Sequence, residues 1–248
     1  KDVKDLHKLK RIIESTNSKH KLERVAGYVE APKHSGYRSI HFVYRYHSRA
    51  ENYTGLWLEL QIRTKLQHNW ATAVETAGIL TNTSLKSSQG SDDWLEFFKI
   101  VSSLFAIKEG LPKLEVHNEL SLQELMTTYY QLCKKLNVIE NLKAIRVSTK
   151  HIESGTLIGH YYLIRINITG KTVNLYAYSK RQYEDATNDY IEFEKGIIEG
   201  ESAVVLVSSS SIKSLKKAYP SYFLDTSEFI QVLEKMNANC ISRGYINS

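Results

Sequence analysis

The first third of the chain alternates hydrophobic and polar positions with two different periods. Apolar residues recur at helical spacing over residues 2–16, which predicts an amphipathic helix. Residues 39–47 and 56–62 alternate with a period of two, which predicts strands with one apolar and one polar face. A shorter run at 24–30 predicts a further strand. These patterns indicate a small sheet with a helix beside it.

The middle of the chain is predicted to be helical. Thr64 and Gln67 have the spacing of a capping box, so a helix is expected from there to about residue 80. Two further stretches of helical period, about 94–108 and 121–136, follow a polar loop.

From about residue 143 onward, short runs rich in Tyr, Ile and Val predict a second sheet. Its expected strands are 144–149, 161–168, 172–178 and 203–207. Its expected helices are 179–198, 212–218 and a last helix capped at Asp225, with Phe229, Val232, Leu233 and Met236 on its apolar face.

Together these elements predict the α+β class. We expect a first domain at 1–110 with a mixed sheet covered by helices, a helical connector at 111–142, and a smaller α+β domain at 143–248.

Composition narrows the class of protein. With 248 residues, 42% hydrophobic and 24% charged, the chain is typical of a globular protein that needs no disulfide or metal to support its core. No run approaches the ~20 apolar residues of a membrane span, and no signal peptide opens the chain. Cys133 and Cys240 form no paired motif, which fits a reducing compartment and argues against structural zinc. The sequence therefore predicts a cytoplasmic protein without a membrane partner.

Charge is distributed unevenly along the chain. Residues 1–68 hold 14 Lys and Arg against 7 Asp and Glu, whereas residues 69–248 hold 19 against 20. The positive excess of +6 therefore comes from the first quarter, which also contains six of the nine histidines. This asymmetry favours an anionic partner there, such as a nucleotide or a nucleic acid.

Three short motifs stand within that region. Residues 32–41 read Pro-Lys-His-Ser-Gly-Tyr-Arg-Ser-Ile-His, residues 58–64 read Leu-Glu-Leu-Gln-Ile-Arg-Thr, and Trp70-Ala71 is followed by Glu75. In this order they resemble the synthetase domain of the RelA/SpoT family, the enzymes that make (p)ppGpp. The resemblance covers about residues 5–110. It implies transfer of pyrophosphate from ATP to the 3′-hydroxyl of GDP or GTP with Mg²⁺, as in the stringent response.

The residues themselves leave several roles open. Glu59 lies mid-strand on the same face as Gln61, so it is either a carboxylate lining a cleft or a charge on a solvent-facing strand. Tyr37 follows a glycine and is either an exposed stacking surface or a turn tyrosine packed on the fold. Lys33, Arg38 and His41 could neutralise phosphate oxygens, although a lone surface cation is more often simply solvated.

The resemblance assigns these residues to a site. It implies that Glu59 binds Mg²⁺ and acts on the attacking hydroxyl, and that Tyr37 stacks on the guanine. We expect Gln61 to orient the nucleotide, and Lys33, Arg38, His41 and Arg63 to complete the acceptor site, with Arg63 alternatively a structural ion pair. His68 and Glu75, two helical turns apart, are expected to support the site or only the helix.

One departure from the family widens the alternatives. The family's upstream Asp-x-x-Gly-x-Arg motif, which supplies much of the ATP site, does not precede Lys1. We therefore expect the chain to hold the acceptor half of the site and to be inactive or weak by itself. A non-catalytic guanine-nucleotide-binding module is one alternative.

A toxin that pyrophosphorylates the 3′ end of tRNA is the other alternative. Residues 204–224 loosely resemble the C-terminal part of fused toxin–antitoxin members that act in phage defence. In that case residues 143–248 would be a regulatory domain that inhibits the enzyme or senses a protein trigger.

Overall fold

The computed structural model describes most of the chain. The described residues are 2–49, 53–81, 83, 85, 89–143, 159–167, 172–197, 202–218 and 226–246. The chain divides into two compact units, one formed by Lys1–Ala71 with Glu96–Tyr129 and the other by Thr72–Leu95 with Tyr130–Ser248. The three-part division expected from the sequence stays a prediction.

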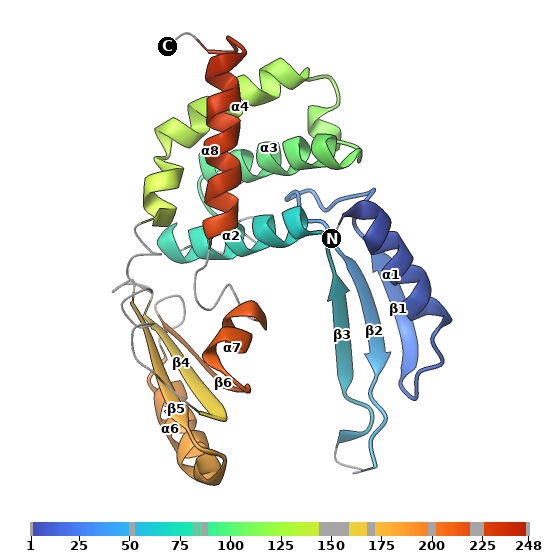
Figure 1. Ribbon diagram of the computed structural model, residues 1–248, viewed down its shortest axis with the longest axis vertical. Coiled ribbons are helices and arrows are strands. Elements are labelled where there is room, and N and C mark those ends of the chain that lie inside the picture. Colours follow the sequence, from blue (N-terminus) through green and yellow to red (C-terminus); the bar gives the residue numbers. More distant parts are fainter. Residues whose placement is uncertain are drawn as a thin grey trace. The chain divides into compact units, whose positions relative to one another are not determined.

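The chain forms runs of strands separated by runs of helices (Figure 1). In chain order they are α1 (Val3–Ser15), β1 (Lys21–Gly27), β2 (Ile40–Arg45), β3 (Trp57–Ile62), α2 (Lys65–Thr81), α3 (Asp92–Glu109), η3 (Glu115–His117), α4 (Leu122–Lys135), β4 (Tyr161–Asn167), β5 (Thr172–Tyr178), η4 (Lys180–Gln182), α6 (Tyr183–Lys195), β6 (Ser202–Ser208), α7 (Ile212–Ala218) and α8 (Ser227–Ser242). The α+β class is confirmed. The predicted strand 144–149 lies outside the described residues.

The first sheet has the strand order β1-β2-β3. Both pairings are antiparallel, so the mixed pairing expected from the sequence is not seen among the described strands. β1 begins earlier than predicted, and the register shifts between Leu22 and Arg24. An irregularity of this kind leaves a residue of the edge strand outside the regular pairing.

The two faces of this sheet differ in chemistry. One face packs under α1, with a core of Leu6, Val29, Ile40, Phe42, Tyr44 and Ile62 (Figure 1). The opposite face, which we call the polar face, carries Lys21, Arg24 and Ala26 of β1, His41, Val43 and Arg45 of β2, and Trp57, Glu59 and Gln61 of β3. Since period-two alternation sets both faces, every predicted site residue of β2 and β3 lies on the polar face.

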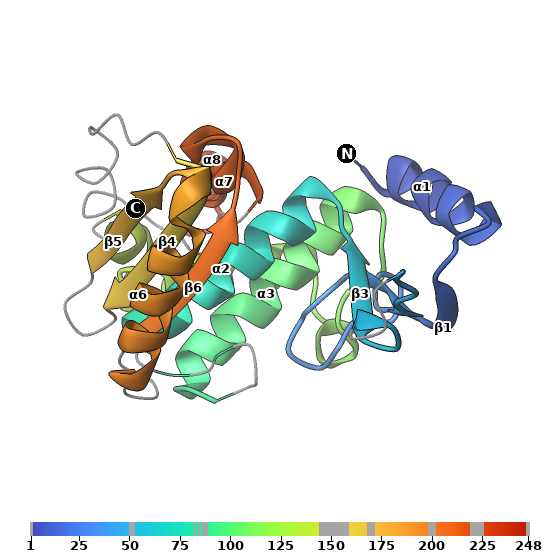
Figure 2. The same ribbon diagram turned by 90° about the horizontal axis from the view of Figure 1, so that it is seen from below.

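Two long helices, α2 and α3, run side by side (Figure 2). The predicted capping box is present, because the Thr64 amide donates to Gln67 Oε1 at 3.1 Å and the Gln67 amide donates to Thr64 Oγ1 at 3.2 Å. The indole of Trp70 on α2 donates to the Phe98 carbonyl of α3 at 2.8 Å. The start of α2 is thereby fixed directly after β3.

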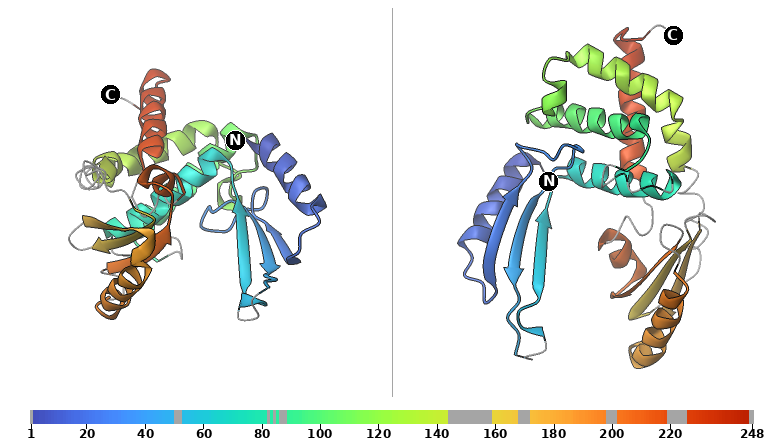
Figure 3. Two further views of the ribbon diagram at one scale, coloured as in Figure 1. Left: turned by 60° about the horizontal axis from the view of Figure 1, so that its bottom comes forward. Right: turned by 180° about the vertical axis from the view of Figure 1, so that it is seen from behind.

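The second sheet has the order β5-β4-β6 and is antiparallel throughout. α6 covers one face through Ala186, Tyr190 and Phe193, and α7 covers the other through Ile212 and Leu215 (Figure 3). Because both faces are covered, β4 is almost continuously apolar, as expected for a strand buried on two sides.

The last helix, α8, buries Phe229, Ile230, Leu233 and Cys240. Its N-cap residue is Thr226, whereas the predicted cap Asp225 lies outside the described residues. Within the described ranges, the helices lack the combination of length and apolar character that a membrane span requires.

Candidate functional site

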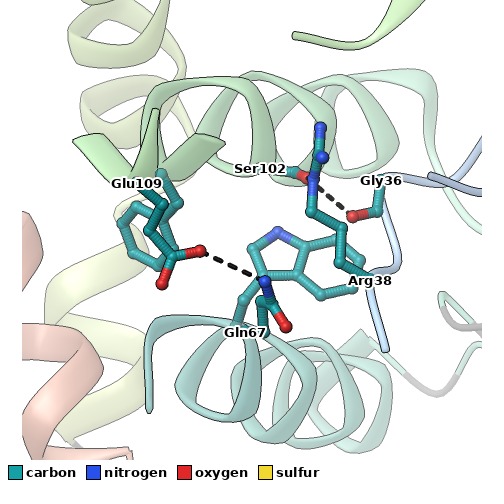
Figure 4. Close-up of a pocket in the computed structure, with 7 residues that line it drawn as sticks. Gly36, Arg38, Gln67, Ser102 and Glu109 are labelled. Atoms are coloured by element: carbon teal, nitrogen blue, oxygen red, sulfur yellow. Dashed lines mark hydrogen bonds between the residues drawn. The ribbon is translucent and has the colours of Figure 1, made fainter. Parts of the chain in front are cut away.

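The loop that carries the first motif is held by its glycine. Gly36 has φ +93°, in the left-handed region, and its carbonyl accepts a 2.6 Å hydrogen bond from Ser102 Oγ on α3 (Figure 4). A Cβ at this position would lie 2.9 Å from Ser102 Cβ and 3.2 Å from Trp70 Cζ2. Only glycine can adopt this left-handed conformation and also leave room for the side chains of Ser102 and Trp70 without strain.

Gly36→Ala is expected to lower the free energy of unfolding by about 3 kcal/mol, the sum of a left-handed alanine and an overpacked contact. Gly110→Ala is the matched control, because Gly110 has φ +70° but no atom within 4 Å of an added Cβ. That control should lose only about 1 kcal/mol. Urea-induced unfolding measures both values, and equal losses would contradict the close packing of the loop on α2 and α3.

Arg38 lies beside this glycine and not on the polar face (Figure 4). The side chain is buried, with Nη1 donating to the Val29 carbonyl and Nη2 to the Pro112 carbonyl at 2.7 Å. Burial lowers the pKa of Arg38 to about 10, against the opposing effects of Glu109 and Glu30, so the side chain is cationic at neutral pH. Arg38 is thus placed apart from the other motif residues, with Nε, Nη1 and Nη2 each donating within the protein, and its contact with the acceptor stays a prediction.

Five of the other predicted residues form one hydrogen-bonded network at the polar face, namely Tyr37, His41, Glu59, Gln61 and Arg63. Glu59 Oε1 lies 2.6 Å from His41 Nδ1, and Glu59 Oε2 accepts from Gln61 Nε2 at 2.7 Å. The Tyr37 hydroxyl lies 2.8 Å from His41 Nε2 and accepts from Arg63 Nη2 at 2.6 Å. Arg63 Nη2 also donates to Gln61 Oε1.

The contacts within the network indicate the protonation states of Glu59 and His41. The hydrogen bond from Gln61, followed by that from His41, lowers the pKa of Glu59, which is therefore a carboxylate at neutral pH. A carboxylate only accepts, so His41 carries a proton on Nδ1. In the neutral ring Nε2 is then an acceptor, and the single proton of the Tyr37 hydroxyl can go either to Nε2 at 2.8 Å or to Gln61 Oε1 at 3.2 Å. Burial lowers the pKa of His41, with Glu59 opposing, which keeps the ring neutral. The Glu59 side chain remains 42% exposed and can still reach a ligand.

Acidification is expected to destabilise the protein through both groups. Their folded-state pKa values lie below the unfolded values, so the unfolded chain binds protons first and stability is lost as the pH falls. The His41 contribution is complete above about pH 6.5, and the Glu59 contribution above about pH 4.5. Urea unfolding from pH 8 to pH 4 measures the slope. In His41→Asn the side chain can still donate to Glu59 but does not titrate, so the free energy of unfolding should depend less on pH below pH 6.5. An unchanged slope in that variant would contradict the lowered pKa assigned to His41.

Cations cover the tyrosine of the network. Tyr37 is only 6% exposed, so its ring is not the open platform that the sequence suggested. Lys33 Nζ lies 5.4 Å from the ring centroid and Arg63 Cζ lies 5.0 Å from it. Lys33 also lies 4.8 Å from the ring centroid of Tyr28, whose edge packs against His41. Cation–π contacts thus surround the Tyr37 ring, and its stacking on a guanine stays a prediction.

Tyr28 is a member of this cluster that sequence reasoning missed. It follows β1 directly, and its amide donates to the Ser39 carbonyl at 2.8 Å. Only the pairing of β1 with β2 brings its ring to His41, so no local pattern marks it.

The remaining predicted residues lie on α2. His68 lines an open hollow together with Gln61 and Arg63, which brings it to the edge of the network. Glu75 lies two turns further along the helix, and its supporting role stays a prediction. Across the described residues, no group of three or more His, Cys, Asp or Glu side chains could hold a metal ion. A cation here would therefore rest on Glu59 together with ligand oxygens.

Comparison with known proteins agrees with the motifs. Residues 1–80 match the family model described as the region found in RelA/SpoT proteins. These residues form a RelA/SpoT region. The resemblance inferred from the three motifs is thereby confirmed, and the polar-face network is the part of this RelA/SpoT region in which the motif residues meet. No curated protein sequence matches the chain.

Solved structures similar to this chain align with 44% of it. They are small alarmone synthetase 1 from Bacillus subtilis bound to its product pppGpp (21% identity, TM-score 0.38), a GTP pyrophosphokinase family protein from Streptococcus pneumoniae (23%, 0.37) and small alarmone synthetase 2 from Bacillus subtilis (17%, 0.37). The alignments cover 54%, 55% and 57% of those chains, so this chain spans little more than half of their length. Because the TM-scores are low, roles of individual residues are not transferred from them.

Proposed function

We propose that the RelA/SpoT region takes part in pyrophosphate transfer from ATP to the 3′-hydroxyl of GDP or GTP, and that its polar face binds the acceptor. The observation that carries the proposal is the Glu59 carboxylate, held through both oxygens by His41 and Gln61 beside a tyrosine covered by two cations. The family match of residues 1–80 supports the same reaction class.

The reaction needs a nucleophile near a carboxylate. The acceptor 3′-oxygen forms a bond to the β-phosphorus of ATP, the bond from that phosphorus to the oxygen it shares with the α-phosphorus breaks, and AMP leaves with that oxygen. The proton of the hydroxyl must pass to a base. Glu59, with its lowered pKa, is better suited to orienting the hydroxyl and holding a cation than to storing that proton.

The residues present fit a magnesium ion. Mg²⁺ is commonly held by one or two carboxylates together with substrate phosphates and waters. Glu59 supplies one partly exposed carboxylate, whose oxygens each accept one hydrogen bond and keep further lone pairs. The ion would neutralise phosphate charge during transfer. Its binding can be read without activity, as the effect of Mg²⁺ on the affinity for GTP.

Tyr37 and its cations support recognition of the guanosine. A base can stack on Tyr37 only if Lys33 or Arg63 leaves the ring, and both are long flexible side chains. Phosphate oxygens of the same nucleotide would draw these cations away and pair with them. Gln61 is hydrogen-bonded to both Glu59 and Arg63, which supports the proposed role of this side chain in orienting the nucleotide.

Incubation of the full-length protein with γ-labelled ATP, Mg²⁺ and either GDP, GTP or tRNA tests the proposal. Label on GDP or GTP would support it, and label on tRNA alone would replace it by the toxin-type reaction. No label, with retained GDP binding, would leave only a nucleotide-binding module.

A further inference from the structure

The polar face continues beyond the network to an exposed tryptophan. Trp57 is 60% exposed, and the guanidinium of Arg45 lies 3.4 Å from its ring centroid. Arg45 Nη1 donates to the Gly55 carbonyl at 2.7 Å, which anchors the guanidinium on the turn. An indole that is stacked by a cation and still mostly exposed leaves a large planar surface open.

The strand register places this surface next to Glu59. Arg45 pairs with Trp57, and Val43 pairs with Glu59, so Trp57 and Glu59 point to the same face two residues apart. At about 3.3 Å per residue they are separated by about 7 Å along β3. A chain of nucleotides could therefore touch both.

Positively charged side chains lie in the same rows of the sheet as Trp57 and Glu59. Arg24 lies in the row of Val43 and Glu59, and Lys21 lies in the row of Arg45 and Trp57. Lys21 pairs with Glu23 at 3.1 Å but remains 76% exposed. Cations interleaved with an exposed aromatic ring are the usual elements of a single-strand binding surface, since phosphates meet the cations and any base can stack on the ring.

We propose that the polar face of the first sheet binds single-stranded nucleic acid, with one base stacked on Trp57 and phosphates on Lys21, Arg24 and Arg45. This site goes beyond the acceptor function, because it lies on the half of the face that the network does not use. A strand bound there would extend toward Glu59 and would compete with or adjoin the nucleotide.

Titration of the full chain with fluorescein-labelled ten-nucleotide RNA and DNA single strands, without ATP or guanine nucleotide, tests the site by anisotropy. Trp57→Ala should weaken binding about tenfold, and Trp57→Phe much less. Arg24→Ala should reduce the dependence of log affinity on log salt by about 0.7. Leu56→Ala, at a neighbouring position that is 54% exposed, is the control and should leave binding unchanged.

A second signal comes from the protein itself. Trp70 and Trp94 are buried, so quenching of tryptophan fluorescence by the oligonucleotide should come from Trp57 and disappear in Trp57→Ala. Binding of the RNA strand alone, or of the RNA and the DNA strand each by itself, supports the site and shows whether it distinguishes ribose from deoxyribose. No binding at low salt, or binding that Trp57→Ala leaves unchanged, overturns it. Because no nucleotide substrate is present, neither result depends on pyrophosphate transfer.

Discussion

In the full-length protein, Glu59→Gln is expected to lower the rate of pyrophosphate transfer to GDP by about 10³-fold. Glutamine keeps the shape of the side chain, but its amide nitrogen must face either His41 or Gln61, both of which donate to Glu59. It also cannot supply the charge that a magnesium ion needs. The initial rate with labelled ATP measures the loss, and the Mg²⁺-dependent part of GDP affinity should disappear with it.

Glu23→Gln is the matched control, because Glu23 is a carboxylate of the same sheet whose contact is an ion pair with Lys21. It should transfer at the rate of the unchanged chain. If Glu59→Gln transferred pyrophosphate within a factor of a few of the unchanged rate and still bound GDP in a Mg²⁺-dependent way, Glu59 would have no role in the reaction.

Arg38→Leu is expected to lower the free energy of unfolding by about 4 kcal/mol, and the melting temperature by about 10 °C. The substitution leaves the carbonyls of Val29 and Pro112 without their donors and removes a contact at 3.4 Å with Ser102. Arg11→Leu, which removes an exposed arginine of α1, should change stability by less than about 0.5 kcal/mol.

This variant also separates a structural role from a binding role. Arg38→Leu that is still folded at low temperature should bind GDP as tightly as the unchanged chain. A weaker affinity without loss of stability would return Arg38 to the acceptor site, where the sequence first put it.

Local sequence patterns were sufficient for most of the described helices and strands and for the face that carries His41, Glu59 and Gln61. The period of two in β2 and β3 predicts that His41, Glu59 and Gln61 share a face, because side chains alternate strictly in strands. The capping boxes at Thr64 and Ser179 are likewise local and are both present. The edge strand β1 was shifted because exposed edge positions carry no apolar pattern.

Burial of the loop residues could not be predicted in the same way. Arg38 and Gly36 are enclosed by Ser102 and Pro112, which are 64 to 74 residues away from them in sequence. Tyr37 is covered by Lys33 and Arg63, of which only Lys33 is a near neighbour. Exposure of a loop side chain depends on such distant partners, so a motif can show that these residues belong together without showing which of them face a ligand.

Isothermal titration of the full chain with GTP, in the presence and absence of Mg²⁺, tests most directly whether the polar-face network is an acceptor site. The expected result is binding that Mg²⁺ strengthens, that Arg63→Met and Gln61→Ala weaken at least about tenfold, and that Glu23→Gln leaves unchanged. Absence of binding heat, or an affinity indifferent to Arg63 and Gln61, would contradict the proposed site.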